Sequence, residues 1–91
     1  PSSEQLLEHT TPPELFVDQP QQLGHMFIFE GATEASATVT INGEKVELDA
    51  DGRFRKTVEI FDEGWNDIVI VAVDPSGNRT ERTERVFVEV Y

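Results

Sequence analysis

Short runs in which every second residue is apolar follow one another along most of this chain, and this alternation constrains the fold more than any other feature. Successive side chains of a β-strand point to opposite faces, so a period of two marks a strand with one buried face. Turn-forming residues separate the runs and leave no room for a crossover helix. Seven strands are therefore predicted, at 15–17, 26–29, 38–41, 45–48, 54–60, 68–73 and 86–91.

The turns between these runs indicate how the strands connect. Asn42-Gly43 is the clearest signal, because both residues accept the positive φ of a type I′ hairpin turn. Further turns are predicted at 49–52 and 74–78, which are rich in Asp and Gly. This pattern predicts an all-β antiparallel fold, either a sandwich or a small barrel.

The 91 residues are enough for one domain with a modest core. Residues 1–12 are polar and end in turn-forming residues, so we expect a linker or tail there. Residues 13–91 contain all of the predicted strands and are expected to form the sandwich domain.

Charge and composition exclude several classes of function. Eighteen acidic residues against seven basic ones give a formal charge of −11, which disfavours binding to nucleic acid and to anionic membrane surfaces. No apolar stretch is long enough to insert into a membrane. The absence of cysteine excludes disulfides and zinc–thiolate sites. No serine has a nucleophile-elbow context and the histidines lack metalloprotease spacing, so we predict no enzyme activity and no cofactor.

Four sequence pieces follow one another in a characteristic order and spacing, namely FEGAT at 29–33, ATVTING at 37–43, DADGRF at 49–54, and EGWNDI at 63–68, which runs on to AVDPSGN at 72–78. Together they resemble the bacterial immunoglobulin-like domains of the glucodextranase domain-B type. We therefore predict an all-β fold, a seven-stranded antiparallel immunoglobulin-like sandwich with Greek-key connections. The resemblance implies a non-catalytic spacer, docking or auxiliary module of a secreted or cell-surface bacterial protein. Its expected location is extracytoplasmic, and its expected partners are neighbouring domains of the parent protein or another protein.

Asp49 and Asp51 form a candidate Ca²⁺ site, since two carboxylates at i and i+2 can point into one loop. The loop does not match an EF-hand, which would need a glutamate where Val58 stands. The alternative is a turn that uses Asp and Gly for backbone reasons alone.

Trp65 is a candidate contact for carbohydrate, because an exposed aromatic ring offers a platform for a sugar. A carbohydrate- or cell-wall-binding module that uses Trp65 and adjacent loops is therefore the alternative function. The structural alternative for Trp65 is a rim residue that caps the core and satisfies its indole N–H at the edge.

The outer faces of the last two strands carry more apolar residues than solvent exposure requires. If Ile68 and Ile70 point inward, their neighbours point outward, and we expect one shared apolar face. The candidate interface consists of Val69, Val71, Phe87 and Tyr91. Alternatively, the stems of Arg55, Arg82 or Arg85 cover this face. The segment 79–85 alternates charged residues with Thr and is expected to discourage pairing at a sheet edge.

Overall fold

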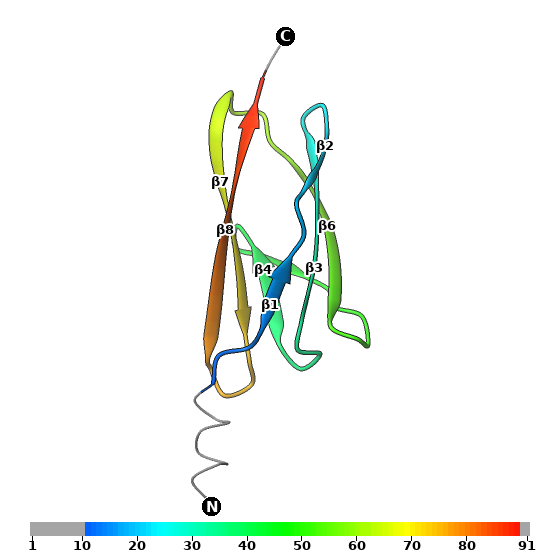
Figure 1. Cartoon of the computed structure of the whole chain (residues 1–91), viewed down its shortest axis with the longest axis vertical. Coiled ribbons are helices and arrows are strands. Elements are labelled where there is room, and N and C mark those ends of the chain that lie inside the picture. The colour runs from blue at the N-terminus through cyan, green and yellow to red at the C-terminus, as the bar shows by residue number, and fades with distance from the viewer. Residues whose placement is uncertain (1–10, 90–91) are drawn as a thin grey trace, which may run out of the picture.

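The computed structural model describes residues 11–89, which form two β-sheets stacked face to face (Figure 1). In sheet A, two short strands pair antiparallel with one edge of a long central strand and a fourth strand pairs with its other edge. The short strands are β1 (Leu15–Val17) and β2 (Gln21–Leu23), the central strand is β3 (Met26–Thr33), and the fourth is β6 (Arg53–Glu59).

Sheet B is also antiparallel and has the order β5-β4-β7-β8. Its strands are β4 (Thr38–Ile41), β5 (Glu44–Val46), β7 (Gly64–Val73) and β8 (Arg79–Val88). The connections β3–β4, β5–β6 and β6–β7 each cross from one sheet to the other. The predicted all-β immunoglobulin-like sandwich is thus confirmed.

Alternation produces the core as the sequence predicts. On β7, Ile68, Ile70 and Ala72 are buried, while Val69 and Val71 are only partly buried on the outer face. The other strands repeat this pattern, and their inward side chains meet between the sheets. The core consists of Leu15, Phe27, Phe29, Val39, Ile41, Val46, Phe54, Ile60, Ile68, Ile70, Ala72, Val86 and Val88.

The prediction of seven strands is wrong by one, because it did not include β2. Gln21, Gln22 and Leu23 are all exposed, so no alternation of buried and exposed residues marks them. The strand forms because Gly24 has a φ of 63°, the positive value that a two-residue hairpin turn requires at its first central position. This turn brings Leu23 opposite Met26.

The Asn42-Gly43 hairpin is as predicted. Asn42 has a φ of 49° and Gly43 a φ of 83°, both positive as a type I′ turn requires. The turn places Ile41 opposite Glu44 and joins β4 to β5.

The last two strands are longer than predicted and form one hairpin of ten residue pairs, from Gly64↔Val88 to Val73↔Arg79. The charged segment 79–85 is the first part of β8, the edge strand of sheet B. Pairing with β7 extends both strands beyond their apolar runs, and for this reason the alternation alone did not reveal their full length.

The described chain enters and leaves the sandwich at opposite ends (Figure 1). At the entry, the buried Pro13 accepts a hydrogen bond through its carbonyl oxygen from Thr80 Oγ1 on β8, at 2.6 Å. The carbonyl oxygen of Glu14 accepts one from Thr33 Oγ1 on β3, at 2.5 Å. Two adjacent residues are thereby fastened to both sheets, and we call this pair of bonds the entry clamp.

Most of the predicted tail at 1–12 lies outside the described residues, as do Val90 and Tyr91. Between residues 11 and 89 there is no helix with the length and apolarity needed to cross a membrane.

Candidate functional site

Trp65 and Phe87 form an aromatic pair on the outer face of sheet B. They lie directly opposite each other on β7 and β8. Their ring centroids are 5.1 Å apart and the ring planes make an angle of 67°, an edge-to-face contact that aromatic rings favour. Trp65 is 61% exposed and Phe87 is 43% exposed. Both rings therefore present apolar surface to solvent and contribute little to the packing of the core.

An ion pair borders the two rings. Asp67 and Arg85 are the next opposite pair on this face of β7 and β8, and Arg85 Nε lies 3.6 Å from Asp67 Oδ1. The Arg85 guanidinium carbon also lies 4.8 Å from the centroid of the Trp65 ring, within cation–π range. Apolar rings and exposed hydrogen-bonding groups therefore adjoin one another. We call these four residues, Trp65, Asp67, Arg85 and Phe87, the Trp65 patch.

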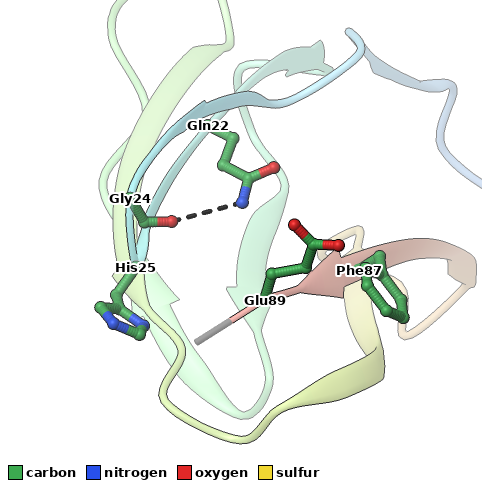
Figure 2. Close-up of a pocket in the computed structure, with 5 residues that line it drawn as sticks. All are labelled: Gln22, Gly24, His25, Phe87 and Glu89. Atoms are coloured by element: carbon green, nitrogen blue, oxygen red, sulfur yellow. Dashed lines mark hydrogen bonds between the residues drawn. The ribbon is translucent and has the colours of Figure 1, made fainter. Parts of the chain in front are cut away.

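A cleft of about 640 Å³ opens beside the patch, between the β2–β3 hairpin and the end of β8 (Figure 2). Phe87 belongs to both the patch and the cleft. Gln22 and Glu89 extend into the cleft, whereas the His25 ring points away from it. The Gln22 amide donates one N–H to the carbonyl oxygen of Gly24 at 3.3 Å, which holds the amide at the cleft wall.

The structure corrects the core-capping alternative for Trp65. The residue lies within β7, and its side chain points outward with 61% of its surface exposed. It contacts Phe87 and Arg85 on the sheet surface and does not cover the core between the sheets.

The candidate interface is not one continuous apolar face. The register places Val69 opposite Thr83 and Val71 opposite Glu81. The Asp67–Arg85 pair separates these valines from Phe87, which instead joins Trp65. Tyr91 lies outside the described residues. An outward position was correctly predicted for Phe87, but its neighbours depend on a strand register that the sequence did not reveal.

The carboxylate of Asp49 organises the turn that contains it. Its Oδ1 accepts hydrogen bonds from the backbone N–H groups of Asp51 and Arg53, both at 2.9 Å. Gly52 completes the turn with a φ of 81°. Within the part of the chain that the structure describes, no group of three or more His, Asp or Glu residues is placed to hold a metal ion. The geometry at Asp49 is that of a backbone turn, and Asp51 is exposed.

Asp74 repeats this arrangement in the β7–β8 turn. Its Oδ1 accepts hydrogen bonds from the N–H groups of Ser76 at 2.9 Å and Asn78 at 2.8 Å. The Asn78 side-chain amide donates to Asp74 Oδ2 at 3.0 Å. This side-chain bond, together with the backbone donors, lowers the pKa of Asp74 below its ordinary value of 3.8. Both acidic turns lie at the end where the chain enters (Figure 1).

Comparison with family models adds the evolutionary relationship. The model described as glucodextranase, domain B, matches residues 27–90, which run from β3 to the end of β8. The chain belongs to this family. A comparison with curated protein sequences finds no match.

As the name of the family states, domain B is one domain of the protein glucodextranase. The domain B match includes the Trp65 patch and both acidic turns, and it confirms the family resemblance predicted from the sequence. It begins after β2, so Gln22 and the hairpin wall of the cleft lie outside the matched residues.

Two features of the Trp65 patch and its cleft were not predicted from the sequence. Phe87 was assigned to the interface rather than to Trp65, and the contribution of Gln22 to a cleft was not foreseen. If β7 and β8 are extended to their full lengths, counting residue pairs outward from the β7–β8 turn places Trp65 opposite Phe87. No sequence signal marked Gln22, because its strand has no alternating pattern.

Proposed function

We propose that this chain is a non-catalytic accessory domain that acts as a rigid spacer in a larger protein. The observation that supports it best is the entry clamp, together with entry and exit of the chain at opposite ends (Figure 1). Because the chain is held firmly where it enters, the orientation of this domain can determine the orientation of a neighbouring domain attached there. Membership of a family named for one domain of an enzyme supports the accessory role.

The partners in this proposal are the neighbouring domains of the parent protein, which attach at the two ends of the sandwich. The parent protein is secreted or displayed at the cell surface, as expected for a module of this type. Fractionation of the source cells with an antibody against the domain tests this location, and recovery in the cytosol would contradict it.

Rigidity at the entry can be measured by distance distributions between spin labels. The chain has no cysteine, so a label pair is introduced without background through Glu14→Cys at the entry and Glu63→Cys near the exit, both exposed positions. A single narrow distribution is expected. In a chain that also carries Thr33→Val and Thr80→Val, which remove the entry clamp, the distribution should broaden.

A broad distribution in the chain with an intact clamp would contradict the spacer role. Turnover of a glycan by the purified chain, beyond that of a mock preparation, would contradict its non-catalytic character. The two measurements are independent, so either half of the proposal can fail alone.

A further inference from the structure

We propose that the Trp65 patch and the adjoining cleft bind a neutral oligosaccharide. The rings of Trp65 and Phe87 meet at 67° and form an angled apolar corner. A sugar ring has an apolar face of C–H groups and a rim of hydroxyls, so it can use an aromatic platform only where hydrogen-bonding groups lie next to the ring.

Such groups are present at the edge of the corner. Arg85 carries several N–H donors and Asp67 accepts through its carboxylate, and both side chains are about two-thirds exposed, at 65% and 64%. Arg85 lies over the indole ring, yet Trp65 remains 61% exposed, so ring surface is left for a ligand. The contact between Arg85 and the indole favours this arrangement of the two side chains before a ligand binds.

The cleft extends the site beyond one sugar ring. Its volume of about 640 Å³ falls within the ~300–1,000 Å³ of small-molecule sites. Phe87 lies at the junction between patch and cleft, and the Gln22 amide projects from the opposite wall (Figure 2). A chain of two or more sugar units could therefore contact Trp65 with one unit and Gln22 with another.

The size and charge of the site favour a sugar over a protein partner. On the outer face of sheet B, the Asp67–Arg85 pair separates the two rings of the patch from Val69 and Val71. Protein interfaces are larger and have a continuous apolar centre. The net charge of −11 would repel an acidic polysaccharide, so the ligand is neutral.

The test is titration of the purified chain with neutral hexasaccharides, namely cellohexaose, laminarihexaose, maltohexaose, isomaltohexaose and chitohexaose. Trp65 is the single tryptophan, so its fluorescence reports on the patch directly. Isothermal titration calorimetry measures affinity, and backbone and side-chain amide NMR shifts locate the bound sugar. We expect binding of at least one hexasaccharide, a shift in Trp65 emission, and NMR changes at Gln22, Trp65 and Phe87.

Trp65→Ala should weaken that binding about tenfold or more, and Phe87→Ala should also weaken it. Phe16→Ala is the matched control, since Phe16 is 63% exposed but lies on β1 in the other sheet. It should leave affinity unchanged. Circular dichroism of each variant confirms the fold.

Three results would overturn the proposal. They are the absence of binding to all five sugars, binding that Trp65→Ala leaves intact, and NMR changes confined to another surface. Loss of contact between this domain and a neighbouring protein domain on Trp65→Ala, without sugar binding, would assign the patch to a protein interface instead. The label-distance experiment does not involve these residues, so the spacer role and the sugar site can fail separately.

Discussion

The hydroxyl of Thr80 donates a hydrogen bond to the carbonyl oxygen of Pro13, a residue 67 positions earlier in the chain, at 2.6 Å. The bond fastens the start of the described chain to the strand with which the sandwich ends. Because Pro13 is buried, no solvent is available to replace this donor if it is removed.

Thr80→Val should therefore destabilise the domain by about 1 kcal/mol, the typical net contribution of such a bond plus part of the cost of an unpaired carbonyl. Equilibrium unfolding in urea measures the change. Thr83→Val is the control, since Thr83 is exposed on the same strand, and it should change stability by less than about 0.5 kcal/mol. Equal effects of the two substitutions would contradict the role given to the Pro13 bond.

Gly52→Ala should be far more damaging than Gly77→Ala, although both residues have positive φ values, of 81° and 89°. A Cβ at Gly52 would lie 2.0 Å from the carbonyl oxygen of Thr33, whereas one at Gly77 would meet nothing within 4 Å. We expect about 1 kcal/mol for Gly77→Ala and more than about 2 kcal/mol for Gly52→Ala. Thermal unfolding of both variants measures the difference, and similar losses would show that backbone conformation alone matters.

The two faces of β7 should respond differently to truncation. Ile70→Ala removes a completely buried side chain and should cost about 2–5 kcal/mol. Val71→Ala, one residue along on the outer face, should cost about 1 kcal/mol or less. A denaturation series on both variants tests the alternation from which the fold was predicted. A larger loss for Val71→Ala would mean that the outer face is covered.

Asp74 should contribute to acid sensitivity. Its pKa is lowered in the folded state, so the stabilisation is present above the unfolded-state value of 3.8 and is lost as the pH falls through the folded-state value. NMR titration should find its midpoint below 3.8. Asp74→Asn should flatten the dependence of the melting temperature on pH between about 2 and 5. A Glu59→Gln variant, altered at an exposed carboxylate on β6, should retain that dependence.

The sequence predicted the architecture well because a sandwich of this kind is encoded locally. The alternation on β7 and the Asn42-Gly43 turn each predict their own structure without reference to the rest of the chain. Gln21–Leu23 shows the limit, since that strand exists only because a hairpin pairs it with β3. The candidate site was predicted less completely than the fold, for a related reason. The contact of Trp65 with Phe87 requires the full lengths of β7 and β8, which extend beyond their apolar runs. The cleft at Gln22 requires β2, which no alternation marks.

The hairpin of β7 and β8 also determines how the domain would respond to mechanical load. Hydrogen bonds of an antiparallel ladder lie across the strands, so a pull along β8 away from Pro13 acts in shear on all ten residue pairs together. At the other end, a pull on Pro13 is shared by both sheets through Thr33 and Thr80. Tension between the two ends is therefore resisted by many hydrogen bonds at once and not by one bond after another. This property suits a domain that connects other domains under mechanical load.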